Sequence, residues 1–177
     1  MNFDDTPQEA AFRAEAKAWI AANAPKQYED ELRKASLGRS AIQGVNLLEV
    51  AKAWQKKKAD AGYACITWPK EYGGRGASPI EAIIFAEEVS AFDVSSGFID
   101  AAVGLIGPAL IRYGTPEQRA RYLKPMLRGD EIWCQLFSEP GAGSDLASLA
   151  TRAIRDGDEW IVNGQKVSTS SAQHADF

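Results

Sequence analysis

The sequence of 177 residues is poor in the side chains that usually hold metals or disulfides. It has one histidine, His174, and two cysteines, Cys65 and Cys134, which lie too far apart in sequence to form a CxxC pair. A lone histidine without other ligands near it in sequence excludes the common zinc motifs, and two isolated cysteines exclude a disulfide framework. We therefore expect no metal site, a surface or packing role for the histidine, and two buried thiols.

The sequence also lacks an excess of positive charge and a long uninterrupted apolar run. Its 20 Lys and Arg residues face 24 Asp and Glu residues, and the net charge of -4 argues against nucleic acid or an anionic membrane as a partner. The most apolar stretch, Phe98–Tyr113, is broken by glycine, proline and charged residues and is too short to cross a bilayer. The first residues carry no signal-peptide pattern. We expect a cytoplasmic protein that does not enter a membrane.

What the sequence does have is a helix-start pattern that occurs three times. The three copies are Thr6-Pro7-Gln8-Glu9, Ser78-Pro79-Ile80-Glu81 and Thr115-Pro116-Glu117-Gln118. In each copy the hydroxyl can accept from a free backbone N–H, proline suits the first helical position, and the Glu or Gln can reach back to the cap. The pattern predicts three helix beginnings.

Apolar periodicity extends these beginnings into a helical domain. The expected helices are 7–23, 47–61, 79–92, 97–113 and 116–127. The helix at 97–113 is so apolar that we expect it to be packed on most sides. The segment 63–76, which contains Gly73, Gly74 and Gly76, is expected to be an irregular connection, because no Gly-Lys-Ser/Thr follows to make a phosphate loop.

The composition changes at Asp130. Residues 131–137 are rich in aromatic and β-branched side chains, and 150–155 and 159–162 flank an Asp-Gly-Asp turn in the manner of a hairpin. The sequence thus predicts an α+β fold, with an all-helical domain at 1–129 and the beginning of an antiparallel β domain at 130–177. An unfinished sheet of this kind would expose an edge.

The segment Ser138–Asp145 is the candidate for chemistry. Its sequence, Ser-Glu-Pro-Gly-Ala-Gly-Ser-Asp, offers backbone N–H groups and two hydroxyls that suit the polar edge of a cofactor. Its spacing matches neither the dinucleotide fingerprint nor the Gly-x-Ser-x-Gly nucleophile elbow. On the residues alone, Phe137 could equally be a core residue and Glu139-Pro140 a simple turn.

Residues 136–145 resemble the signature of the acyl-CoA dehydrogenase family. Four further groups of segments resemble family landmarks in the right order: 68–74, 114–118 with 121–123, 127–131 and 163–166. The match spans nearly the whole chain. The resemblance implies the α+β fold given above, with the family's C-terminal helical domain absent from these 177 residues.

The resemblance implies a role in fatty acid and lipid metabolism. The family oxidises an acyl-CoA thioester to the 2-enoyl-CoA: a glutamate removes the α proton, and the β hydrogen leaves as hydride to FAD. The resemblance further implies an electron-transferring flavoprotein as acceptor and a homo-oligomer, either dimer or tetramer. We expect the catalytic base beyond residue 177 and none within these residues.

Carried over residue by residue, the resemblance implies two cofactor-binding runs. Their members are Gln135, Phe137, Ser138, Gly143, Ser144, Ser168, Thr169 and Ser170. Ser138 would lie near the flavin ring, Gly143 and Ser144 near the phosphates, and Ser144 would also touch the acyl-CoA substrate. Ser168 stands where the family usually has a tryptophan, so the apolar contact with the flavin would be weaker by about 1 to 3 kcal/mol.

Two alternatives stay open at this point. The chain could be a non-catalytic fragment or a flavin-poor partner subunit of the same fold, which the serine at position 168 favours. It could also be a relative that passes electrons to oxygen or acts on another substrate, because one fold can host different chemistry.

Overall fold

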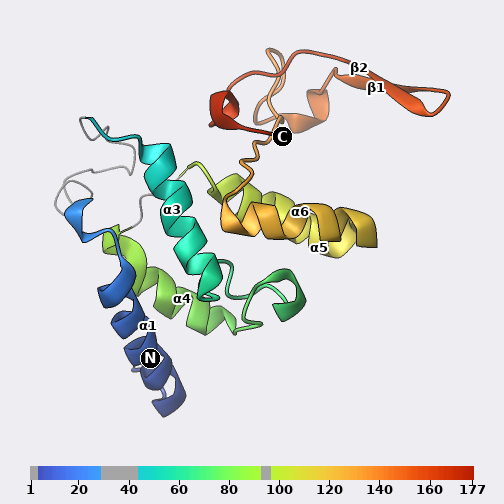
Figure 1. The fold of residues 1–177 in the computed structure, drawn as a ribbon. Helices are drawn as coiled ribbons and strands as arrows, with labels where there is room; N and C mark the ends of the chain where they lie inside the picture. Colours follow the sequence, from blue (N-terminus) through green and yellow to red (C-terminus); the bar gives the residue numbers. More distant parts are fainter. Residues whose placement is uncertain (1–3, 29–43, 93–96) are drawn as a thin grey trace.

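The computed structural model describes residues 4–28, 44–92 and 97–177. The α-helices are α1 (Pro7–Asn23), α3 (Leu47–Asp60), α4 (Pro79–Val89), α5 (Gly107–Tyr113) and α6 (Pro116–Arg128), and the strands are β1 (Arg152–Asp156) and β2 (Glu159–Asn163). Short 3-10 turns occupy Lys26–Tyr28, Lys70–Tyr72, Ser90–Phe92, Leu146–Ser148 and Ala172–His174. Figure 1 shows the helices gathered in one body, with the hairpin set apart at one end. The predicted α+β class is confirmed. The polar segment expected after the first helix lies partly in 29–43, outside the described residues.

All three predicted helix starts form complete capping boxes. At α1 the Glu9 N–H donates to the Thr6 hydroxyl over 3.3 Å, and the Thr6 N–H donates to the Glu9 carboxylate over 2.7 Å. The same reciprocal pair forms around Ser78 and Thr115, with proline at the start of each helix. These helices begin where they do because local side chains satisfy the backbone donors that a helix leaves free.

Among the described residues, the helical core consists of two clusters, and the 63–76 connection contributes to both. The first contains Phe12, Ala16, Ile20, Tyr63, Ile66, Ile84 and Phe85, and the second contains Ala64, Trp68, Ala102, Leu123, Met126 and Leu127. The irregular segment 63–76 therefore supplies buried side chains to both. Trp68 is 5% exposed, and a Cβ on Gly107 would lie 2.2 Å from its ring. The predicted connection is thus part of the core.

The apolar stretch 97–113 differs from the prediction. It includes a five-residue π-helix, Ala102–Ile106, immediately before α5. Pro108 has no N–H to donate to the carbonyl four residues earlier, and a wider turn accommodates that loss. Leu105 is 43% exposed and Tyr113 is 78% exposed, so the expectation of packing on most sides is wrong. Within the described ranges no helix is both long and apolar enough to cross a membrane.

The β part is one antiparallel hairpin in which Ile154 pairs with Ile161 and Arg155 with Trp160. The predicted hairpin is confirmed. Every residue of both strands is exposed, because each face of the two-stranded sheet lacks a covering layer among the described residues. Both cysteines of the chain are free and half-buried, so the expectation of buried thiols is met only in part; burial raises the pKa of the Cys65 thiol to about 12.

Candidate functional site

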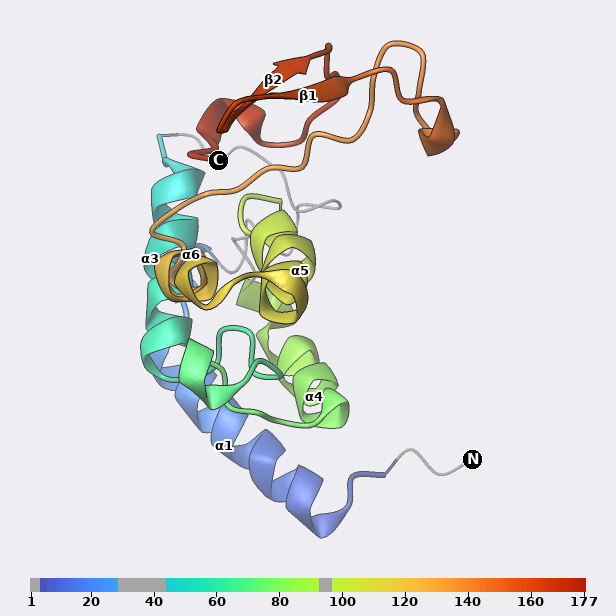
Figure 2. The same cartoon turned by 90° about the vertical axis from the view of Figure 1, so that its right-hand side faces the viewer.

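The segment that leads into the candidate loop is extended, and residues 131–137 form no strand although they are rich in aromatic and β-branched side chains. Figure 2 shows this segment running from the end of α6 along the helical body towards the hairpin. Its backbone bonds go to two separate places: the Cys134 N–H donates to the Phe177 carbonyl (2.9 Å), and the Val167 N–H donates to the Ser138 carbonyl (3.0 Å). Scattered bonds of this kind do not make a continuous ladder.

An aromatic cluster attaches the extended segment to α6. Trp133 stacks on Phe177 with 4.5 Å between ring centroids, and the Tyr122 ring meets both edge-on at 5.2 and 5.6 Å. Next to it, Arg121 pairs with Glu131 over 2.8 Å. Because edge-on and stacked aromatic pairs are favourable and directional, the cluster determines where the segment leaves the helical domain.

The candidate loop begins with a closed two-residue turn. Glu139 and Ala142 exchange both backbone hydrogen bonds, over 2.8 and 3.1 Å, with Pro140 and Gly141 between them. Glu139 and Ala142 are buried, whereas Pro140 and Gly141 are exposed. The interpretation of Glu139-Pro140 as part of a turn is therefore confirmed, and the turn presents its backbone at the surface.

Packing within the chain explains why residue 164 must be glycine, but it gives no reason for the two loop glycines, Gly141 and Gly143. A Cβ on Gly164 would lie 2.0 Å from the Thr151 hydroxyl, so packing requires glycine there. A Cβ on Gly141 or Gly143 would meet no heavy atom of the described chain within 4 Å, and neither glycine has a positive φ. The bare backbone of these two glycines leaves room for a ligand to approach the main chain.

A buried carboxylate lies under this turn. Glu139 accepts from the Lys166 ammonium at 2.8 Å and from the backbone N–H groups of Ala150 and Thr151 at 2.7 and 3.0 Å. Its side chain is 6% exposed. The Lys166 ammonium, together with Thr151 and the Ala150 N–H, lowers the pKa of Glu139 to about 2. The carboxylate is therefore ionised and joins the turn to the hairpin.

The second predicted run lies next to the loop. Lys166 also donates to the Phe137 carbonyl over 3.0 Å, and the neighbouring residue Val167 carries the bond to Ser138 described above. Ser168 then adopts a left-handed φ of 54° and is exposed. Left-handed backbone on a residue other than glycine is costly, and such strain clusters at binding sites. The run continues to Ser171, whose hydroxyl donates to the Gly97 carbonyl of the helical domain.

The structure brings some of the predicted cofactor residues together and leaves others apart. Contacts join the stretch around Ser138 to the run that begins at Val167. Exposed members are Gln135, Phe137, Gly143, Ser144, Ser168 and Ser170, and half-buried members are Ser138 and Thr169. Phe137 is 49% exposed, so the core interpretation of this residue is wrong. No described contact joins Ser144 to the second run.

Sequence reasoning missed the two residues that hold the site together, Glu139 and Lys166. The sequence pattern assigns Glu139 only to a turn, and Lys166 only to the family landmark 163–166. A signal was present: one Glu stands among the Pro, Gly, Ala and Ser residues of the 138–144 stretch, and one Lys follows the Asn163-Gly164 pair. An isolated charge in such a stretch needs a partner when it becomes buried.

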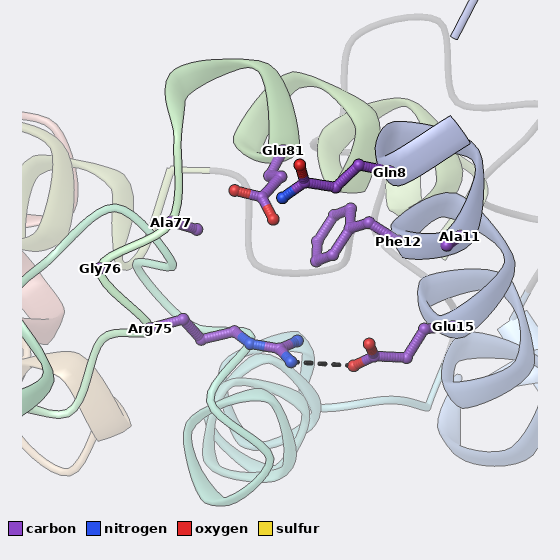
Figure 3. Close-up of a pocket in the computed structure, with 8 residues that line it drawn as sticks. All are labelled: Gln8, Ala11, Phe12, Glu15, Arg75, Gly76, Ala77 and Glu81. Atoms are coloured by element: carbon purple, nitrogen blue, oxygen red, sulfur yellow. Dashed lines mark hydrogen bonds and ion pairs between the residues drawn. The ribbon is translucent and has the colours of Figure 1, made fainter. Parts of the chain in front are cut away.

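A separate open pocket of about 400 Å³ lies in the helical domain between α1, α4 and Arg75. Figure 3 shows Arg75 reaching across it to Glu15 on α1, with Phe12 beside them. One Arg75 nitrogen donates to Glu15 over 2.9 Å, the Tyr63 hydroxyl donates to the same oxygen over 2.7 Å, and the guanidinium lies 4.6 Å from the Tyr63 ring centroid. Because these contacts attach α1 to the 63–76 connection, we assign the group a structural role.

Fold and site together define a class: a helical domain, continued through an extended segment into an antiparallel β part that presents a bare-glycine loop. The chain belongs to the acyl-CoA dehydrogenase family. The family model for the acyl-CoA dehydrogenase N-terminal domain matches residues 6–130, and the model for the acyl-CoA dehydrogenase middle domain matches residues 134–177.

Curated and solved relatives agree with this membership. Acyl-CoA dehydrogenase IpdE1 of Mycobacterium tuberculosis is 42% identical over 161 residues, which are 91% of this chain and 41% of that protein. In the ChsE4-ChsE5 complex from Mycobacterium tuberculosis, one chain superimposes with a TM-score of 0.74 at 34% identity, over 99% of this chain and 42% of that one. A glutaryl-CoA dehydrogenase from Mycobacterium smegmatis, solved with FADH2, gives a TM-score of 0.68 at 25% identity, over 97% and 41%. The chain thus spans less than half the length of these relatives.

Proposed function

We propose that this chain supplies the N-terminal part, divided at 129/130 into helical and β domains, of an acyl-CoA dehydrogenase that oxidises an acyl-CoA thioester to the 2-enoyl-CoA with FAD. The observation that carries the proposal is the pair Gly141 and Gly143, whose bare backbone neither φ nor internal packing explains. Family membership supports the same reaction, since the relatives named above are acyl-CoA dehydrogenases.

The residues present fit FAD. A Cβ on either loop glycine would project into open space, and the exposed Phe137 ring, two residues before the turn, offers apolar area. Residues proposed to hold the cofactor are Gln135, Phe137, Ser138, Gly143, Ser144, Ser168, Thr169 and Ser170. When bound, FAD would accept the hydride from the β carbon of the substrate.

The proposed tasks of the chain's own residues are binding and orientation. Backbone N–H groups around Gly143, together with the exposed Ser144 hydroxyl, suit phosphate oxygens, because successive bare amides make an anion-binding concavity. Ser144 is also proposed to contact the acyl-CoA. Ser138 and Thr169, both half-buried, present hydroxyls that can accept from or donate to a flavin ring edge. The general base that removes the α proton is proposed to lie beyond residue 177.

The proposed partners follow the same family reasoning. They are an acyl-CoA substrate, an electron-transferring flavoprotein as acceptor, and further copies of the same chain in a dimer or tetramer. In the solved ChsE4-ChsE5 complex a chain similar to this one assembles with a second chain, which supports an oligomer. Ser168 favours a second candidate function, a flavin-poor partner subunit, because an exposed serine buries little area against a ring.

An FAD titration of the purified chain, followed by absorbance, tests the proposal. We expect the protein to bind FAD and Gly143→Leu to bind it about tenfold or more weakly, because the new side chain occupies the ligand's space. Gly104→Leu is the matched control, since a Cβ there also meets no heavy atom of the described chain within 4 Å. Equal affinity of Gly143→Leu and the unchanged protein would contradict the assigned loop. Absence of bound flavin in the unchanged protein would favour the partner subunit.

A further inference from the structure

One carboxylate and one ammonium connect three segments of the β part: 137–139, 150–151 and the stretch that contains Lys166. Glu139 reaches the start of the hairpin through the backbone N–H groups of Ala150 and Thr151, over 2.7 and 3.0 Å. Lys166 bridges the Glu139 carboxylate, at 2.8 Å, and the Phe137 carbonyl, at 3.0 Å. Apart from this pair, one backbone hydrogen bond among the described residues joins the loop stretch to the following run. In that bond the Val167 N–H donates to the Ser138 carbonyl.

Burial makes the pair costly to break. The Glu139 side chain is 6% exposed and the Lys166 side chain is 19% exposed. A buried ion pair that loses one partner leaves an uncompensated charge, so its geometry is retained only when both members are present. The bonds also leave Glu139 few free lone pairs, because three donors already point at its two oxygens.

We propose that Glu139 and Lys166 are a positioning pair that holds the 138–144 loop and the 168–170 run as one rigid unit. Glu139 directly follows Ser138, and Lys166 stands two residues before Ser168. A displacement of either charged side chain therefore moves one hydroxyl-bearing run relative to the other. The inference rests on the proposed function for the identity of the ligand, but neither charged group needs to touch it.

The pair can be tested first without any flavin, by amide hydrogen exchange on the full chain. We expect Lys166→Met to speed exchange at Val167, Ala150 and Thr151 by about tenfold or more, because these amides are protected only while the two runs stay together. Amides in the middle of α1 and α6 should be unchanged. Lys166→Arg should restore protection, since it keeps a charged donor. Lys56→Met, at an exposed lysine on α3, is the matched control.

A double-mutant cycle with Glu139→Gln adds the second measurement. If the two residues act as one unit, the double variant should lose about as much protection as the worse single variant. FAD affinity should follow the same order, about tenfold weaker in Lys166→Met and near the unchanged value in Lys166→Arg. Unchanged exchange at Val167 in Lys166→Met, strictly additive losses, or no rescue by arginine would each overturn the proposal.

The two proposals fail differently. If the unchanged protein binds no FAD, the proposed function fails, while the exchange rates measured without flavin still decide the positioning pair. If FAD binds with equal affinity to the unchanged protein and to Lys166→Met, the positioning pair fails and the proposed function stands.

Discussion

The Lys166 ammonium lies 2.8 Å from the Glu139 carboxylate, although the two residues are 27 positions apart in the sequence. Between them the chain makes the 140–145 loop, a short 3-10 turn and the whole β hairpin. The pair thus joins the two ends of the 140–165 segment. Contacts of this kind keep a surface loop in one arrangement even where the sheet beside it is short.

Glu139 should make the loop sensitive to acid. Its pKa in the folded protein is lowered to about 2 from an ordinary 4.5, chiefly by the Lys166 ammonium. A lowered folded-state pKa stabilises the fold fully above the ordinary value, and this contribution is lost as the pH falls towards the folded value. We therefore expect the loop to loosen as the pH falls from 4.5 to about 2.

Carboxyl NMR shifts recorded against pH provide the check. Glu139 should titrate with a midpoint near 2, and in Lys166→Met the midpoint should move upward, because the principal cause of the lowered pKa has been removed. Glu139→Gln identifies the signal by its disappearance. A midpoint near 4.5 in the unchanged protein would contradict the buried ion pair.

Gly164→Ala should destabilise the base of the hairpin. The new Cβ would lie 2.0 Å from the Thr151 hydroxyl oxygen and 2.7 Å from the Thr151 Cβ, so one of the two segments must move. We expect a loss of about 1 to 3 kcal/mol, measured by chemical denaturation or by exchange at Ala150.

A matched pair of variants separates this clash from a general effect of losing a glycine. Gly141→Ala should change stability by less than about 0.5 kcal/mol, since a Cβ there meets nothing within 4 Å. Thr151→Ala should relieve part of the loss when it is combined with Gly164→Ala. Equal losses for Gly141→Ala and Gly164→Ala would show that the close approach is not the cause.

Gln55→Leu should weaken the contact between α3 and α6. The Gln55 side chain is 3% exposed and donates to the Leu127 carbonyl over 2.7 Å. Leucine would leave that buried carbonyl without its donor, at a cost of about 1 to 3 kcal/mol. Thermal unfolding gives the measurement, with Lys56→Leu at the exposed neighbour as control. A melting temperature for Gln55→Leu as high as that of the control would argue against the bond.

Local chemistry was sufficient to predict the helix beginnings and the hairpin. Thr6, Ser78 and Thr115 each carry their own cap within four residues, so nothing distant is needed to satisfy the first helical amides. The hairpin likewise turns at Gly157, whose φ of 62° suits glycine. The ordered loop signature was also sufficient to place the chain in its family, which the family models confirm.

The predictions that failed concern features that depend on contacts between residues far apart in the sequence. The segment 131–137 has the composition of a strand but stays extended without a ladder, because a strand needs a partner and propensity alone supplies none. The stretch 97–113 has the composition of a buried helix, yet which of its sides faces the core depends on where Trp68 and α6 lie. The burial of a side chain depends on which residues pack against it, and the sequence pattern does not identify those residues.

The sequence by itself determined where the helices begin, where the hairpin turns and which family the chain belongs to, because each depends on residues close together along the chain. Only the tertiary structure decided that Glu139 is a buried anchor for Lys166 and that Gly141 and Gly143 are open while Gly164 is enclosed. Those distinctions depend on which distant segments meet, and distance in space is what a local pattern does not contain.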